Sequence, residues 1–300
     1  LPFNTGSEGP GRTGGAGNPL PSPGRSGYRT AYLWEQVWDA DNWLDLLERF
    51  IHVKRDKDDK GRRRETVIFP RFHQWHAVRS LVDHAARHGA GHNYLIMHSA
   101  GSGKSNTIAW LAHRLSSLHT PADPALMDPA AVAKGLEPNT PVFDKTVIIT
   151  DRSVLDRQLQ ETVGDFSQVE GLVGRIGGKG GSKSAQLAEA LSTSSKRIIV
   201  VTLQTFPALL DYLKREPTEI RGGKFAIVVD EAHSSQSGEA AKDVKKALRD
   251  LGLDADDDTD DAEDTAKSTE EALRESAAFR GRSANLSYFA FTATPKHKTL

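Results

Sequence analysis

Two glycines, a lysine and a serine stand at a spacing suited to phosphate binding in the segment His98–Ser105, which reads HSAGSGKS. An apolar run, Tyr94–Met97, precedes the segment and a helical pattern follows it, which is the context that a phosphate-binding loop requires. Glycines let consecutive backbone N–H groups turn toward phosphate oxygens, and the start of a helix adds partial positive charge. A Gly-rich turn with a chance lysine is the alternative, and His98 stands where Gly or Ala is usual. The predicted phosphate-binding residues are Gly101, Ser102, Gly103, Lys104 and Ser105.

Two adjacent carboxylates follow a second apolar run, in the segment Phe225–His233 that reads FAIVVDEAH. Such a run delivers the carboxylates to the carboxyl end of a strand, where sites in α/β proteins lie. ATP and Mg²⁺ are the expected bound species, because Lys104 can reach the β- and γ-phosphates and Ser105 can ligate Mg²⁺. The second segment can also be an ordinary helix start with surface acids. We expect Asp230 to hold Mg²⁺, Glu231 to orient and activate the attacking water, and His233 to sense the γ-phosphate.

Further along the chain, the stretch FTATP again follows an apolar run. We expect Thr292 and Thr294 in this stretch to hydrogen-bond across to the acidic segment and to link hydrolysis to movement. The order of the three motifs is that of superfamily-2 motors. The stretch RFHQ, before the first strand, resembles the adenine-reading segment of these ATPases, with Gln74 as the reader, although it can be an ordinary helix start.

Hydroxyl, amide and basic groups also follow two other apolar runs, in the segments Thr150–Arg152 and Thr202–Thr205. Such groups at strand ends bind nucleic-acid phosphate without reading base sequence. The basic stretch Lys54–Arg64 could grip DNA as well, but an exposed charged loop is the favoured interpretation. The candidate DNA contacts are Arg152, Thr202 and Gln204.

The elements that must position these residues alternate between strands and helices. Short β-branched runs without clean alternation predict strands buried on both faces of a parallel sheet, with helices between them. The fold class is therefore α/β, with a mostly parallel sheet and helices on both faces. The predicted strands are 94–97, 146–150, 197–202, 225–230 and 288–292, and the predicted helices are 74–88, 104–119, 154–163, 184–191, 204–213 and 239–251.

Composition shifts divide the chain of 300 residues into three parts. Residues 1–30 form a flexible Gly/Pro-rich arm, residues 31–65 a helical linker with two short helices near 32–51, and residues 66–300 the main domain. We expect loop insertions at about 120–141, 174–184 and 252–270. The acidic run within the last of these is interpreted as a solvated loop rather than an interaction tail.

The overall charge excludes a strongly basic protein, because 39 Lys and Arg nearly balance 40 Asp and Glu. Any nucleic-acid contact must therefore come from local patches. The absence of cysteine excludes disulfides and thiolate metal sites, and no apolar run approaches the roughly 18 residues that a membrane span needs. The default expectation is a cytoplasmic protein without membrane contact. The start at Leu1 and the stop shortly after Thr294 suggest a fragment of a longer chain.

With these motifs assembled, the chain resembles the restriction (R) subunit of type I restriction–modification enzymes, whose motor is of the superfamily-2, DEAH-box type. The resemblance rests on the stretches HSAGSGKSNTIAWLAHRL, VIITDRSVLDRQL, VVTLQTF and VVDEAHSSQSG, and on LPFN, GAGNP, YLWEQVW and LDLLERFIH nearer the start. It implies a RecA-like P-loop ATPase lobe that pumps double-stranded DNA, together with methyltransferase (M) and specificity (S) subunits. It also implies a nuclease domain before Leu1 and a second RecA-like lobe with an arginine finger after Leu300. We therefore expect this fragment alone to bind nucleotide weakly and to hydrolyse it poorly.

Three other functions stay open at this point. A stand-alone superfamily-2 helicase or remodelling ATPase would share the motor but lack the nuclease. A nucleotide-binding interaction module would have lost catalysis, which the intact Lys104, Asp230 and Glu231 disfavour. A P-loop kinase for a small molecule is disfavoured by the residues that follow Asp230 and by the FTATP stretch.

Overall fold

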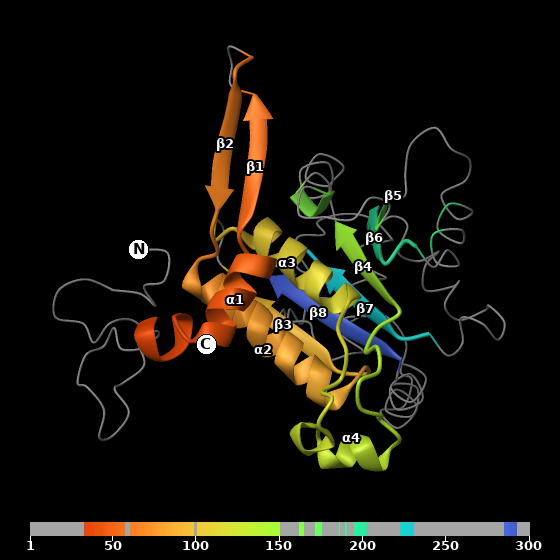
Figure 1. The fold of residues 1–300 in the computed structure, drawn as a ribbon. Coiled ribbons are helices and arrows are strands. Elements are labelled where there is room, and N and C mark those ends of the chain that lie inside the picture. Colours follow the sequence, from red (N-terminus) through yellow and green to blue (C-terminus); the bar gives the residue numbers. More distant parts are fainter. Residues whose placement is uncertain are drawn as a thin grey trace, which may run out of the picture. The chain divides into compact units, whose positions relative to one another are not determined.

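The computed structural model describes most of the region from residue 33 to residue 150 and a set of shorter segments beyond it (Figure 1). The described residues are 33–57, 61–98, 101–150, 162–164, 172–175, 186, 190, 195–202, 223–230 and 285–292. The predicted arm at 1–30 lies outside them. The chain divides into two compact units, Leu1–Ser80 and Leu81–Leu300, and helix α2 (Phe72–His88) contributes residues to both.

Two helical segments open the described part of the first unit. The π-helix η1 spans Leu33–Val37 and α1 spans Ala40–Arg49, as the pattern of apolar residues predicts. Asp39 caps α1, because its side chain accepts a hydrogen bond from the backbone N–H of Asn42 at 3.2 Å. The buried apolar side chains are Val37, Leu46 and Phe50, and the exposed ones are Trp34, Trp38, Trp43, Leu44 and Leu47.

A β-hairpin follows α1, and it corrects the interpretation of the basic stretch as a loop. Strands β1 (His52–Lys57) and β2 (Arg63–Ile68) pair in antiparallel register, with Val53 opposite Val67. The pattern was misleading because charges dominate the composition, whereas β-branched residues that favour strands lie at the end of the hairpin next to α1 and α2. The predicted domain boundary at residue 66 falls inside β2, and the predicted linker is therefore only partly helical.

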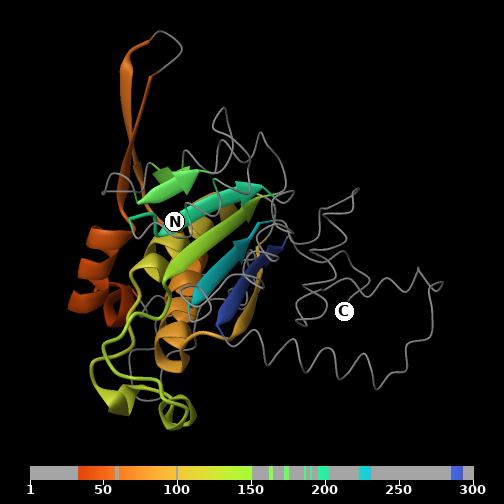
Figure 2. The same cartoon turned by 90° about the vertical axis from the view of Figure 1, so that its right-hand side faces the viewer.

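The second unit is built on a six-stranded, entirely parallel sheet with the order β3-β8-β7-β4-β6-β5 (Figures 1 and 2). The strands are β3 (Asn93–Met97), β4 (Lys145–Thr150), β5 (Val173–Arg175), β6 (Ile198–Thr202), β7 (Phe225–Val229) and β8 (Leu286–Thr292). The five predicted strands are confirmed to within two residues. Short β5 was missed, because its residues overlap the start of the Gly-rich stretch predicted as an insertion. The predicted α/β fold with a mostly parallel sheet is confirmed.

Burial follows the position of each strand in the sheet. Every residue of β4 and β7 is buried, as expected for central strands of a parallel sheet. Strand β3 instead alternates, with Leu95 and Met97 exposed, because it lies at the edge of the sheet. Complete burial was therefore the wrong expectation for this strand.

Helix α3 (Lys104–Ser116) packs against β4, β6 and β7 and covers one face of the sheet (Figure 2). Its buried residues include Ile108, Trp110, Leu111 and Leu115. The helices predicted between 154 and 251 lie almost wholly outside the described residues, apart from helical positions at 162–164, 186 and 190. Among the described residues, no helix is long and apolar enough to cross a membrane.

The insertion at 120–141 is an ordered loop. It contains the 3₁₀ turn η2 (Pro124–Leu126) and the short helix α4 (Pro129–Ala133), each preceded by an aspartate cap. The hydroxyl of Thr120 closes its base, since it donates to the carbonyl of Glu137 at 2.7 Å and accepts from the N–H of Thr140 at 2.9 Å. These bonds satisfy polar groups that a loop of this length would otherwise leave to water.

Three histidines cluster where α2 ends and β3 begins. The rings of His84 and His88 stack with centroids 3.9 Å apart, and His92 meets both rings edge-on. Nδ1 of His84 lies 3.0 Å from the hydroxyl of Tyr94. Burial, and secondly the charge of His88, lowers the pKa of His84 and of His92, and the carboxylate of Asp128 opposes this shift for both.

The cluster predicts that the second unit loses stability in acid. In the unfolded chain, His84 and His92 bind protons near the ordinary histidine pKa of about 6.5, whereas in the folded protein they bind protons only at lower pH. The free energy of unfolding should therefore decline as the pH falls from about 7 toward 5. Replacing both His84 and His92 with glutamine should flatten the decline measured by urea unfolding. An unchanged decline in the double variant would contradict this assignment.

Candidate functional site

The predicted phosphate-binding loop lies between the end of β3 and the start of α3. His98 is buried directly after β3, and residues 99 and 100 lie outside the described part of the chain. Gly101 and Gly103 have φ angles of 76° and 83°, in the left-handed region that favours glycine. A Cβ at Gly101 would meet nothing within 4 Å, so its backbone conformation, not crowding, accounts for the glycine there.

Gly103 is the N-cap of α3 and has no side chain with which to cap the first turn. Its carbonyl accepts from the N–H groups of Asn106 and Thr107 at 3.1 and 3.3 Å, and from the hydroxyl of Thr107 at 3.4 Å. Lys104 and Ser105 are the first two helical residues and are half-buried, while Ser102 is buried. The sequence prediction omitted Thr107. The signal that could have found it is its position four residues after Gly103, which lets its hydroxyl donate to the Gly103 carbonyl.

Asp230 follows β7 directly and is half-buried at the carboxyl end of the sheet. Its backbone N–H donates to the carbonyl of Ile149 in β4 at 3.0 Å, which continues the ladder by one residue. Strand β8 is the single strand between β7 and β3. Neighbouring strands lie about 4.8 Å apart, so the backbones that lead to Asp230 and to the loop are separated by about 10 Å.

Other predicted residues lie at the same edge of the sheet, because all its strands are parallel. Thr202 ends β6 in register with Thr150 of β4, and Thr292 ends β8 in register with Met97 of β3. The structure thus brings Thr202, Thr292 and Asp230 to the edge that carries the loop. Outside the described residues lie Glu231, His233, Thr294, Arg152 and Gln204.

Gln74 belongs to the first unit and has a structural role at the start of α2. Its Oε1 accepts a hydrogen bond from the backbone N–H of Arg71 at 2.7 Å, and the side chain is buried. Arg71 is the residue before the helix and Gln74 is its third position, so this is one half of a capping box. The alternative of an ordinary helix start therefore has direct structural support.

A magnesium ion is the metal that this chemistry implies. The described residues contain no group of three or more histidine or acidic side chains arranged to hold a metal. A magnesium site needs none, because Mg²⁺ keeps several waters and is bound through one or two protein oxygens together with substrate phosphates. The Ser105 hydroxyl and the Asp230 carboxylate fit that donor set, since both are oxygen ligands at the same end of the sheet.

Comparison with known proteins identifies relatives over much of the chain. Endonuclease subunits of type I restriction enzymes from Staphylococcus aureus strains MSSA476 and MRSA252 are 24% identical over 179 residues, 60% of this chain. The chain spans only 16% of the length of those subunits. This similarity agrees with the resemblance that the motifs predict.

Among solved structures, UvsW of bacteriophage T4 has a TM-score of 0.39 at 14% identity and covers 86% of this chain and 35% of its own. A hypothetical ATP-dependent RNA helicase from Sulfolobus tokodaii has a TM-score of 0.33 at 16% identity and covers 74% and 51%. The fold assignment rests on the strand order rather than on these values. The family model for the SWI2/SNF2 ATPase matches residues 73–253, which contain the phosphate loop, strand β7 and Asp230. The chain belongs to the SWI2/SNF2 ATPase family.

Proposed function

We propose that this chain is the ATP-hydrolysing motor lobe of a type I restriction endonuclease subunit and that it drives the movement of duplex DNA. One observation carries the proposal: the loop after β3 and the carboxylate after β7 lie at the same edge of a parallel sheet, with one strand between them. Sites in open α/β sheets lie at that edge. The similarity to type I endonuclease subunits supports the choice of restriction as the setting.

The described residues have distinct roles in this proposal. Backbone N–H groups at the start of α3 donate to phosphate oxygens, and the partial positive charge of the helix end favours the anion. Lys104 neutralises charge on the β- and γ-phosphates. Ser105 and Asp230 hold Mg²⁺, which polarises the phosphates when it is bound. The gap of about two strand spacings leaves room for phosphate oxygens between the hydroxyl and the carboxylate.

The remaining roles rest on the sequence motifs. Glu231 orients and activates the attacking water, and His233 senses the γ-phosphate. Thr292 and Thr294 couple hydrolysis to movement of a second lobe, which supplies an arginine to the transition state. Arg152, Thr202 and Gln204 contact the DNA backbone, and M and S subunits complete the enzyme. Hydrolysis by this lobe alone is then weak, because the arginine that stabilises the transition state comes from a second lobe.

A second function has support from the family match. Members of the motor class can work without a nuclease, and the SWI2/SNF2 match covers only motor residues. A stand-alone helicase or remodelling ATPase would use the same loop and the same aspartate. The two functions differ in whether DNA is cut.

ATP-dependent cleavage of unmethylated circular DNA separates the two functions. The intact protein is mixed with its methyltransferase and specificity subunits, and the Lys104→Ala variant is run alongside. We expect cleavage that requires ATP and disappears in the variant. ATP hydrolysis stimulated by DNA without cleavage would establish the stand-alone motor instead.

Gln74 caps a helix through its hydrogen bond to Arg71, and its second, proposed role is to read adenine; the two roles predict different effects for two substitutions. Gln74→Glu keeps an oxygen for the Arg71 N–H and should therefore melt at a higher temperature than Gln74→Ala, which loses the cap at a cost of about 1 kcal/mol. If the amide N–H₂ also reads adenine, both variants should lose the preference for ATP over GTP. Thermal unfolding and the ratio of kcat/KM for the two nucleotides measure these effects. A retained preference in both variants would leave Gln74 as a cap alone.

A further inference from the structure

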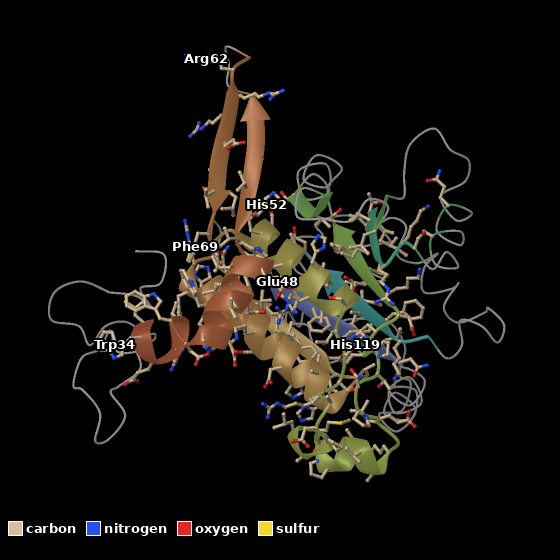
Figure 3. All side chains as sticks on the ribbon, in the orientation of Figure 1. Trp34, Glu48, His52, Arg62, Phe69 and His119 are labelled. Carbon is tan, nitrogen blue, oxygen red and sulfur yellow. The ribbon has the colours of Figure 1, made fainter. Side chains whose placement is uncertain are left out.

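No residue proposed for the ATP site lies in the hairpin β1–β2, and most of the described side chains of the hairpin are exposed. Val53, Lys54 and Val67 are exposed, and so is every described residue from Gly61 to Glu65. Figure 3 labels Arg62 at the turn end of the hairpin and His52 and Phe69 at the other end. An isolated two-stranded hairpin is only marginally stable in water. The described side chains of this hairpin are mostly exposed and none is fully buried, so a binding role explains the hairpin better than packing does.

The charge of the hairpin is unlike that of the chain as a whole. Residues 52–68 contain seven Lys or Arg against four Asp or Glu, whereas the chain has a net charge of −1. Among the described side chains of the hairpin, Lys54, Arg62, Arg63 and Arg64 are exposed cations and Glu65 is the single exposed acid. The local excess of positive charge is therefore largest in the half of β2 next to the turn.

The register concentrates this charge further. Arg64 lies opposite Asp56, and Glu65 lies opposite Arg55. Arg63, in contrast, lies opposite Lys57, so a cation has a cation as its cross-strand neighbour. Like charges at directly opposite positions destabilise a hairpin, and an anionic ligand at the turn end would remove that cost.

We propose that the hairpin β1–β2 binds the phosphate backbone of duplex DNA through Arg62, Arg63 and Arg64. Guanidinium groups match phosphate geometry, and a two-stranded ribbon is narrow enough to follow a groove of the duplex. Arg62, Arg63 and Arg64 are consecutive and span about 7 Å of chain, so they present three cations to a short stretch of the phosphate backbone. The choice of duplex DNA as the partner rests on the function proposed above, whereas the anionic character of the partner rests on the hairpin itself.

The test measures binding of a duplex of random sequence to the intact protein without nucleotide, over a range of salt concentrations. The variant Arg62→Gln/Arg63→Gln/Arg64→Gln should weaken binding by roughly tenfold or more near 0.1 M salt. It should also lower the slope of log affinity against log salt by about 2 to 3, since each phosphate contact contributes about 0.9. Replacing the same arginines with lysine should restore most of the affinity and the slope, which separates charge from hairpin folding.

Two controls separate this proposal from the proposed function. Arg49→Gln/Arg87→Gln/Lys134→Gln removes three exposed cations elsewhere and should bind duplex like the wild type. Lys104→Ala should lose ATP hydrolysis and keep duplex binding, so a failure of the motor and a failure of the hairpin give different results. Wild-type affinity and a wild-type salt slope in the hairpin variant would overturn the proposal. Binding of the intact protein to an acidic protein that depends on the three arginines, with duplex binding that does not, would also overturn it.

Discussion

Lys104→Ala should lower the rate of ATP hydrolysis by the intact protein by roughly a thousand-fold. Lys104 is the first residue of α3, directly after the left-handed Gly103. In the proposed site its ammonium is the cation that meets charge on the β- and γ-phosphates. Removing one such donor from a preorganised site costs about a hundred- to a thousand-fold in other enzymes, and here the donor carries a full charge. Release of phosphate, measured at saturating ATP and DNA, gives the rate.

Lys134→Ala is the matched control for this substitution. Lys134 follows α4 in the ordered insertion and is exposed, so its loss removes the same charge without touching the loop. The control should hydrolyse ATP like the wild type. A Lys104→Ala protein that keeps more than a small fraction of the wild-type rate would remove the phosphate loop from the mechanism.

Asp230→Asn should give the second large effect, a fall in ATP hydrolysis of roughly a hundred-fold with a raised requirement for Mg²⁺. Asparagine keeps the shape and size of the side chain but replaces a charged oxygen ligand with a neutral one, which binds Mg²⁺ more weakly. A titration of the rate against Mg²⁺ separates a metal ligand from a structural residue, because a structural defect would lower the rate at every concentration alike.

Asp144→Asn is a control at the opposite end of the same sheet, where the strands begin. Asp144 precedes β4, and its carboxylate accepts from the backbone N–H of Lys224 at 2.7 Å, just before β7. Asparagine can still accept that bond through its carbonyl oxygen. The Asp144 variant should therefore keep both the rate and the Mg²⁺ dependence, and equal losses in the two variants would contradict a specific role for Asp230.

The sheet could be predicted from sequence because its central strands are continuous apolar runs. Residues Thr146–Thr150 and Phe225–Val229 have few polar positions, and only burial on both faces of a parallel sheet suits such runs. The phosphate-binding loop could be predicted equally well, since two glycines before Lys104, between a strand and a helix, are typical of such a loop. The position of β8 between β3 and β7 was not legible, because strand order depends on packing that no local pattern encodes.

The features that sequence missed share a physical cause, which is that side-chain chemistry is ambiguous without its neighbours. The many charged residues of the hairpin favoured a loop in the sequence, whereas the structure pairs the two segments as strands with Val53 opposite Val67. The sequence cannot tell whether the amide of Gln74 caps a helix or reads a base. The hydrogen bond from the Arg71 N–H shows that it caps the helix. Exposure of Leu95 follows from the place of β3 at the sheet edge rather than from its sequence.

The most direct test of the central claim is ATP hydrolysis by the intact protein with and without duplex DNA, compared with the Lys104→Ala and Asp230→Asn variants. The proposed site predicts hydrolysis that duplex DNA stimulates and that both variants lose. Hydrolysis that survives in both variants would show that the loop after β3 and the carboxylate after β7 do not form the site of ATP hydrolysis.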